Sequence, residues 1–319
     1  MTNETYTART AVDLIAIAPH ALGFQPHDDV VLMAFGSPGG TFHARVDLLT
    51  GTDDQHQIAE MLVGAVVRNR GTGAAVLIYS TDAEVAAAQG RVLCDRLHAA
   101  GVDVIDVVRV EAERYFPALE DGAEGTAYDV TGHPFTTQRV FEGEVVERSR
   151  EALADTLVGT DEDDREAVAR AAEAIMAAGS APGPVARDAQ WLLACLRARL
   201  RRRGGLPLTA ADAGRVLALC RSIPLRDLAW AEMTRDNAAA CVDVWRDLVR
   251  RAPDELLPPA AALLGFAAWL AGDGALAWCA LDRCTEVDPD YSLAQCIADL
   301  LLGAVPPTVW DEMCADGAG

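Results

Sequence analysis

Lysine is absent from the sequence, and all 27 basic residues of the 319-residue chain are arginine. A chain without lysine has no Schiff-base lysine, no lysine general base and no phosphate-binding P-loop lysine. The formal net charge of −21 also argues against a general affinity for the phosphates of nucleic acid or an anionic membrane. We therefore expect neither nucleic acid nor a membrane as a partner.

Histidine is missing from the second half, because the last histidine of the chain is His133. Of the eight cysteines, only Cys94 precedes it, and no two cysteines have the CxxC spacing. Zinc sites usually combine such cysteine pairs with each other or with histidine. We predict no metal, no cofactor and no disulfide, with the cysteines acting as small buried apolar residues in a reducing cytosol.

Long apolar runs are also missing. The longest, at residues 260–271, falls short of the roughly 20 residues that a membrane-spanning helix needs. The polar residues 1–9 lack the basic and then apolar pattern of a secretory signal. We expect a cytoplasmic protein.

The common catalytic signatures are absent as well. The sequence has no GxSxG elbow, no HExxH, no P-loop, and no GxGxxG between a strand and a helix. Their absence lowers the expectation of familiar hydrolase, dehydrogenase or nucleotidase chemistry. The composition, with 51 % hydrophobic and 24 % charged residues, is that of an ordinary globular chain with a length suited to about two domains.

The first half shows the pattern of an α/β domain, which we place at residues 1–158. The apolar runs 30–35 and 42–48 flank a Gly- and Pro-containing turn and predict an antiparallel hairpin. Two helical segments then alternate with the apolar runs 74–79 and 101–110. We predict a mixed, largely parallel sheet flanked by helices, in which strands 42–48, 74–79 and 101–110 run parallel.

The sequence predicts a capping box at the start of each of these two helices. Thr52 is followed by Gln55 and Thr81 by Glu84, a spacing that satisfies the first backbone N–H groups of a helix. We predict that Thr52 and Thr81 are the capping residues. Residues 114–147 mix glycine, proline and aromatics, and there we expect short strands and loops.

The second half, residues 159–319, has the pattern of an all-helical domain of antiparallel hairpins. A linker rich in Gly, Pro and Ala is expected near residues 179–184. Beyond it, helices are predicted at about 185–203, 209–221, 225–234, 237–251, 258–271, 274–286, 291–303 and 307–314.

A repeat is visible within this half. Cys241, Trp245, Leu248 and Pro253 recur as Ala277, Leu281, Cys284 and Pro289, each 36 positions later. The segment 261–289 resembles a tetratricopeptide repeat, with small residues where two helices approach and a proline after the second helix. An ordinary helical bundle with similar spacing is the alternative.

Candidate ligand-binding residues lie where the parallel strands end, because ligands of α/β sheets gather at that edge. Those ends carry Asp47, then Tyr79, Ser80 and Asp82, then Glu111 and Arg114. We take Asp47, Ser80, Asp82 and Arg114 as the candidates for a polar ligand. The alternative is that Ser80 and Asp82 only cap a helix and Arg114 only pairs with a nearby acid.

Several short motifs recur in one family: Leu22, Gly23 and Phe24 with Pro26; Arg114 before Tyr115 and Phe116; Gly143 ahead of Ser149 and Arg150; GDGALA at 272–277; and DPDYSLA at 288–294. Together they resemble the actinobacterial domain-of-unknown-function family 4192 over nearly the whole chain. An all-arginine composition agrees with a GC-rich actinobacterial genome. The resemblance implies origin and architecture but no activity, and Tyr115 stands where the family often has Trp.

Two hypotheses of function follow. The first is a non-catalytic interaction or scaffold protein whose helical half binds a protein or peptide partner, or a second copy of the chain. The second is a small-ligand-binding protein or enzyme that uses the strand-end crevice of the α/β domain. The missing catalytic motifs and the repeat-like helices favour the first.

Overall fold

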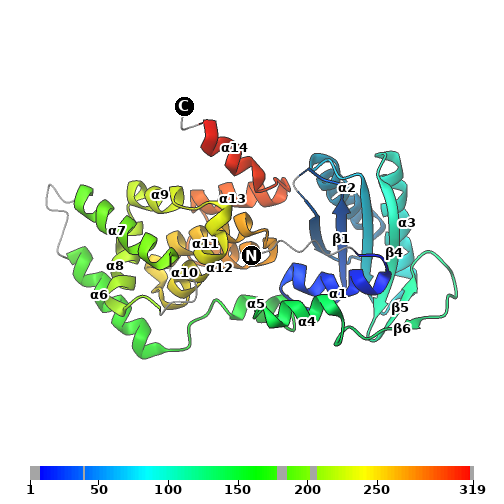
Figure 1. Cartoon of the computed structure of the whole chain (residues 1–319), viewed down its shortest axis with the longest axis horizontal. Helices are drawn as coiled ribbons and strands as arrows, with labels where there is room; N and C mark the ends of the chain where they lie inside the picture. Colours follow the sequence, from blue (N-terminus) through cyan, green and yellow to red (C-terminus); the bar gives the residue numbers. More distant parts are fainter. Residues whose placement is uncertain (1–7, 39, 178–184, 202–206, 317–319) are drawn as a thin grey trace. The chain divides into compact units, whose positions relative to one another are not determined.

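The computed structural model describes residues 8–38, 40–177, 185–201 and 207–316. The chain divides into two compact units, and each is considered by itself (Figure 1). The first unit is Met1–Arg150 with Ala304–Pro306, and the second is Glu151–Gly303 with Pro307–Gly319. The linker predicted near residues 179–184 lies outside the described residues.

A mixed six-stranded sheet in the order β2-β1-β3-β4-β5-β6 forms the centre of the first unit. Its elements are α1 (Ala11–Leu22), β1 (Asp29–Phe35), β2 (Phe42–Asp47), α2 (Thr52–Arg68), β3 (Gly73–Tyr79), α3 (Ala83–Ala99), β4 (Asp103–Glu111), β5 (Arg114–Pro117), β6 (Thr126–Ala127) and α4 (Pro134–Phe141).

The strand directions agree with the sequence. β1 pairs antiparallel with both β2 and β3, and β3 pairs in parallel with β4. Strands β2, β3 and β4 therefore run in one direction, as predicted, and β1 and β2 form the predicted hairpin. The hairpin places β1 between β2 and β3, which the order of elements along the chain did not reveal.

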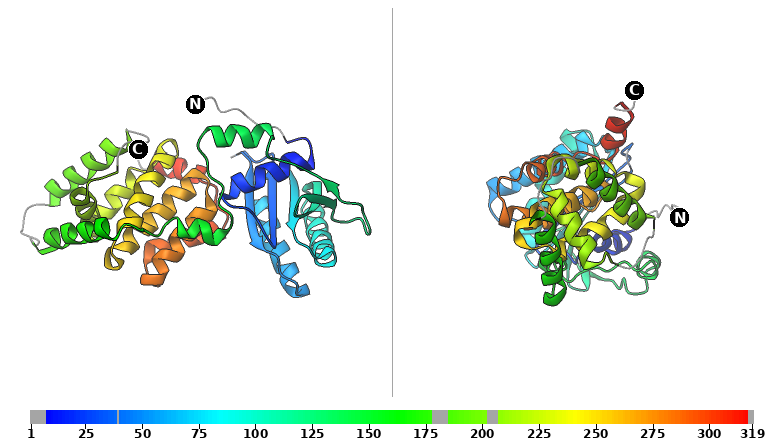
Figure 2. Two further views of the ribbon diagram at one scale, coloured as in Figure 1. Left: turned by 90° about the horizontal axis from the view of Figure 1, so that it is seen from below. Right: turned by 90° about the vertical axis from the view of Figure 1, so that its left-hand side faces the viewer.

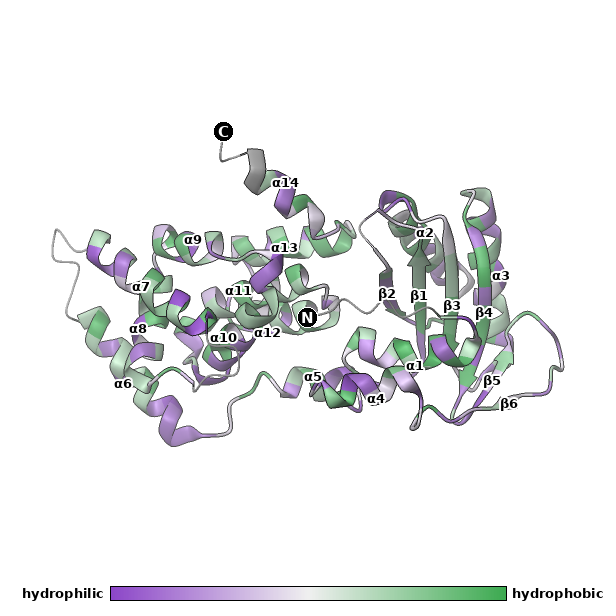
Figure 3. Cartoon of the chain, viewed as in Figure 1, coloured by the Kyte–Doolittle hydropathy of each residue, from purple (hydrophilic) through white to green (hydrophobic). Residues whose placement is uncertain are grey.

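Helices cover both faces of this sheet (Figure 2). On one face, alternate side chains such as Val30 and Val76 pack in a continuous core with Leu62 of α2 and Leu93 of α3. The other face, to which the intervening residues point, lies under α1. Because both faces are covered, β1 and β3 are buried and apolar along most of their length (Figure 3).

Two local predictions for this unit are wrong, and a third is incomplete. The N-cap of α2 is Gly51, with no side-chain hydrogen bond, so Thr52 is already helical. The cap of α3 is Asp82 and not Thr81, because the Asp82 carboxylate accepts two of the first N–H groups. The region 114–147, where we expected only short strands and loops, also contains the helix α4, which begins with a proline.

All the described residues of the second unit are helical or irregular, with no strand among them. Its helices are α5 (Arg150–Asp155, which begins at the unit boundary), α6 (Glu162–Ala177), α7 (Val185–Leu200), α8 (Ala210–Cys220), α9 (Ile223–Ala231), α10 (Ala238–Arg251), α11 (Leu257–Ala271), α12 (Gly274–Val287), α13 (Ser292–Leu302) and α14 (Thr308–Asp316). From α7 onward they agree with the predicted helices to within a few residues.

Helix α11 is the centre of this unit. It is buried on all sides and packs against α8, α10, α12 and α13. Small residues permit this packing: a Cβ added at Gly265 would come within 2.9 Å of Leu281 Cδ2. The GD pair of the GDGALA motif turns the chain into α12, since Gly272 takes a φ of 82° and Asp273 caps the next helix.

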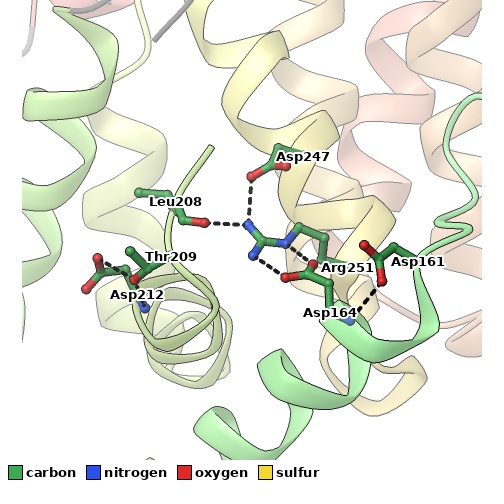
Figure 4. A network of polar contacts seen from close by, with 7 residues as sticks. All are labelled: Asp161, Asp164, Leu208, Thr209, Asp212, Asp247 and Arg251. Carbon is green, nitrogen blue, oxygen red and sulfur yellow. Dashed lines mark hydrogen bonds and ion pairs between the residues drawn. The ribbon is translucent and has the colours of Figure 1, made fainter. Parts of the chain in front are cut away.

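Two buried arginines join helices that are distant in sequence. Arg251 of α10 donates to both carboxylate oxygens of Asp164 at 2.6 and 3.0 Å, to Asp247 at 3.1 Å and to the carbonyl of Leu208 at 2.8 Å (Figure 4). Arg226 of α9 donates to the hydroxyl of Tyr291 at 3.0 Å. The tyrosine of the DPDYSLA motif therefore has a structural partner.

Candidate functional site

A row of side chains, polar except for one valine, crosses the sheet at the edge where β2, β3 and β4 end. Cross-strand pairing aligns one residue from each strand. Because directly paired residues share a face of a sheet, these side chains lie on the face under α1. From β2 to β6 the row consists of Asp47, Asp29, Tyr79, Val110, Tyr115 and Thr126. We call it the strand-end row.

Asp29 is the buried charged group of this row, with 1 % of its surface exposed. Its Oδ1 lies 2.5 Å from Nη2 of Arg45, and its Oδ2 accepts the backbone N–H of His27 at 3.0 Å. The same Arg45 nitrogen lies 2.8 Å from Asp47 Oδ1. Burial raises the pKa of the Asp29 carboxyl, although Arg45 acts in the opposite direction.

Tyr79 stands directly opposite Asp29 on β3. Only 5 % of its surface is exposed, and its hydroxyl has no hydrogen-bond partner among the described residues. Burial raises the pKa of this phenol, and the neighbouring Tyr128 and Asp29 raise it further. A buried hydroxyl without a partner costs free energy, about 1–3 kcal/mol, unless water or a ligand supplies one.

The structure does not gather the four predicted site residues. Asp47 is in the strand-end row, paired with Arg45. Ser80 follows β3, and its hydroxyl accepts the N–H of Asp82 at 3.1 Å. Asp82 in turn accepts the N–H groups of Glu84 and Val85, both at 3.0 Å. Asp82 thus has the capping role that we gave as the alternative, and Ser80 holds the turn that leads into the cap.

Arg114 is also separated from Asp47. It immediately precedes Tyr115 of the strand-end row, so its side chain leaves β5 on the opposite face of the sheet. There its guanidinium donates to the carbonyl of Gly125 in the turn before β6. The pairing with an acid that we gave as the alternative is thus replaced by a contact with the backbone of the turn.

Sequence reasoning overlooked Asp29 and Arg45, although the pattern held a signal for both. Arg45 and Asp47 are two residues apart on one strand and therefore share a face. Asp29 is the only charged residue at the start of an otherwise apolar strand. When an apolar strand begins with an acid and the next strand carries an arginine on the same face, the two residues are expected to form an ion pair.

A second feature lies in the helical unit, where three aromatic side chains form what we call the aromatic seat: Trp230 of α9 with Phe266 and Trp269 of α11. Trp230 meets Phe266 edge-on at 5.3 Å between ring centroids, and Phe266 lies 5.4 Å from Trp269. Phe266 is fully buried. The indole N–H of Trp230 is buried without an acceptor among the described residues.

Trp310 of α14 occupies this seat. Its ring stacks on Trp230 at 5.5 Å with 15° between the planes, and it meets Phe266 edge-on at 4.9 Å. Its Nε1 donates to the carbonyl of Met233 at 2.9 Å. The next residue, Asp311, lies 2.8 Å from Nη1 of Arg235. One tryptophan and one acid therefore hold a helix on this surface.

The cysteines of the described part of the chain are all free. Burial raises the pKa of Cys220, Cys241 and Cys284 to about 12, so these thiols stay protonated at neutral pH. Within the described residues, no three His, Cys, Asp or Glu side chains are grouped to hold a metal ion. No described helix has the length and apolar character to cross a membrane.

A family model described as "Domain of unknown function (DUF4192)" matches residues 12–308. The chain belongs to the DUF4192 family. Neither the curated proteins nor the solved structures contain a match. The family match spans both units, from α1 through the start of α14, so the strand-end row and the helices of the aromatic seat both lie within the DUF4192 region.

Proposed function

We propose that this DUF4192 chain is a non-catalytic interaction protein whose helical unit docks a helix of a protein partner in the aromatic seat. The observation that carries the proposal is that a short helix is already held there by Trp310. Binding surfaces commonly concentrate their energy in a few aromatic and arginine anchors. The seat supplies the aromatic rings, and Arg235 after α9 supplies the arginine.

The chemistry of the seat suits a helix. The ring of Trp230 offers a face for stacking, the carbonyl of Met233 accepts an indole N–H, and Arg235 offers a positive charge. The buried indole N–H of Trp230 can also donate a hydrogen bond to a side chain of the partner. Each of these groups comes from α9, or from the segment after it, and α11 supplies the apolar floor.

The tetratricopeptide-like arrangement belongs to this proposal. The 36-residue offset and the close approach of Gly265 to Leu281 both support hairpins of that kind in α10 to α13. Such hairpins serve as docking surfaces because stacking them creates an extended face. A second copy of the chain is one source of the partner helix.

The test uses the full-length chain with Trp310→Ala, which empties the seat, and a fluorescent peptide with the sequence of residues 305–316, carrying Cys314→Ser. We expect saturable binding by fluorescence anisotropy. A peptide with Trp310→Ala should not bind, and Trp230→Ala in the protein should weaken binding. Unchanged circular dichroism verifies that the variants fold. If the first peptide does not bind the emptied seat, the proposal is wrong.

A second candidate function is the binding of a small polar ligand at the strand-end row. The observation that favours it is the hydroxyl of the buried Tyr79 opposite Asp29, which has no hydrogen-bond partner among the described residues. Strongly perturbed ionisable groups in such places are often functional. A thermal-shift screen of nucleotides, sugars and amino acids against the wild type and Tyr79→Phe tests it. A hit that the variant loses supports the site, and hits that it retains, or none, contradict it.

A further inference from the structure

We infer that α14 is a tethered competitor for the aromatic seat, so that a partner must displace it with a helix of the same chemistry: a tryptophan followed directly by an acidic residue. The inference rests on the proposed docking function and specifies its partner and its regulation. In the structure described, the seat is closed by the chain's own C-terminal helix.

Few contacts hold α14 in place. Of its side chains at residues 308–313, none is buried, and Met313 is 60 % exposed. The helix projects away from the other helices of its unit (Figures 1 and 2). Its described anchors are Trp310 in the seat and Asp311 on Arg235. A helix that is held by two adjacent residues can leave without unpacking the core behind it.

The anchors define the partner. The flat stacking of Trp310 on Trp230 requires an aromatic ring, and the hydrogen bond to the Met233 carbonyl requires that this ring carry an N–H. Indole and imidazole carry one, and the larger face of indole favours tryptophan. The pairing with Arg235 requires an acid at the following position. The chain as a whole has a net charge of −21 and would repel an acidic helix. The exposed Arg235 provides a local positive charge that favours an acidic residue at this position.

The connection before α14 makes the helix an effective competitor. Only residues 303–307 separate α13 from α14. Pro306 and Pro307 stiffen this tether, and Ala304 takes a φ of 47°, a conformation that costs a non-glycine residue free energy. A short tether gives an effective concentration on the order of millimolar, so α14 outcompetes a free helix of equal affinity that is present at micromolar concentration.

The experiment compares the affinity of the full-length wild type and of Trp310→Ala for the peptide of residues 305–316. If α14 closes the seat in at least nine molecules of ten, the wild type should bind the peptide at least about tenfold more weakly. Asp311→Arg, which repels Arg235 and loosens α14 without removing its tryptophan, should bind with intermediate affinity. Glu312→Arg changes the charge equally at the next, exposed position and should match the wild type.

The outcomes separate the two proposals. Equal affinity of the wild type and Trp310→Ala, or of Asp311→Arg and Glu312→Arg, overturns the competitor and leaves the docking function in place. A peptide that binds neither protein refutes the docking function and the competitor together. A peptide with Asp311→Arg should bind the emptied seat at least about tenfold more weakly, and equal binding would refute the required acid.

Discussion

The two units pair their charged side chains in different ways. Within the sheet of the α/β unit, arginines pair with acids on the adjacent or the same strand: Arg45 and Asp29 lie on neighbouring strands, and Arg109 pairs with Glu111 two residues away. In the helical unit the buried Arg251 reaches an acid on a helix far along the chain, Asp164 of α6. In the sheet, strand pairing places the charged residues next to each other. Between packed helices, a long side chain has to cross from one helix to the other.

Arginine suits this second kind of contact better than lysine does. Arg251 makes four hydrogen bonds to three groups in different directions. A guanidinium has five donors in one rigid plane, whereas an ammonium has three on a single atom. A lysine at this position would leave part of the network unsatisfied. The helical unit therefore depends on arginine in a way that the sheet does not.

The most severe test of this comparison is Arg251→Ala. It leaves Asp164 and Asp247 without their cation, and we expect a loss of about 2–4 kcal/mol in the free energy of unfolding. The control is Arg197→Ala, whose pair with Glu232 involves an arginine that is 53 % exposed, and which should cost below about 1 kcal/mol. Urea unfolding followed by tryptophan fluorescence reports on this unit, since all six tryptophans lie in it. Equal losses of stability in the two variants would contradict the larger contribution of the buried Arg251.

Glycine substitution sharpens the comparison of packing. A Cβ at Gly214 of α8 would meet the backbone oxygen of Val168 at 2.5 Å, whereas one at Gly90 of α3 meets only side-chain carbons at 3.1 Å or more. Gly214→Ala should therefore destabilise the protein by about 2 kcal/mol, because backbone cannot move aside easily. Gly90→Ala should stay within about 1 kcal/mol of the wild type. Chemical denaturation monitored by circular dichroism measures both, and a milder effect at Gly214 would refute the close helix contact.

The α/β unit should respond to acid through His43. Burial lowers the pKa of this imidazole, which is hydrogen-bonded to the backbone of Ala21. The unfolded chain then binds more protons than the folded one below about pH 6.5, so stability falls as the pH drops, by at most about 1.4 kcal/mol per pH unit for this group.

His43→Gln should reduce this acid sensitivity, whereas His56→Gln, on the exposed side of α2, should not. The opening free energies of β1 and β3 amides, obtained by hydrogen exchange at pH 7.5 and 5.5 after correction for intrinsic rates, measure the effect. Identical pH dependence in the two variants would exclude His43 as its source.

The smallest expected effect concerns the cap of α3. Asp82→Ala removes an acceptor for two backbone N–H groups and should cost about 1 kcal/mol. Thr81→Ala should leave the stability of α3 nearly unchanged. Hydrogen exchange of the amides in the first turn of α3 distinguishes the two variants. A larger loss of protection in Thr81→Ala would show that Thr81 is the capping residue, as the sequence suggested.

Most elements of the fold could be predicted from local pattern. The hairpin, the common direction of three strands and the helices after residue 185 follow from apolar periodicity and from Gly and Pro at the boundaries. The candidate site could not be predicted as well. Ser80, Asp82 and Arg114 were grouped because they follow strands, but each is held by a local backbone contact.

The sequence by itself determined most of the secondary structure, the lack of lysine chemistry and the membership of the DUF4192 family, because these depend on residue type and on spacing over a few positions. Only the tertiary structure decided that Asp29 faces Tyr79, and that Trp310 fills a seat on α9 and α11. Those contacts join residues that are distant along the chain. They depend on strand order and helix packing, which cooperative burial of the whole core selects and which no local pattern encodes.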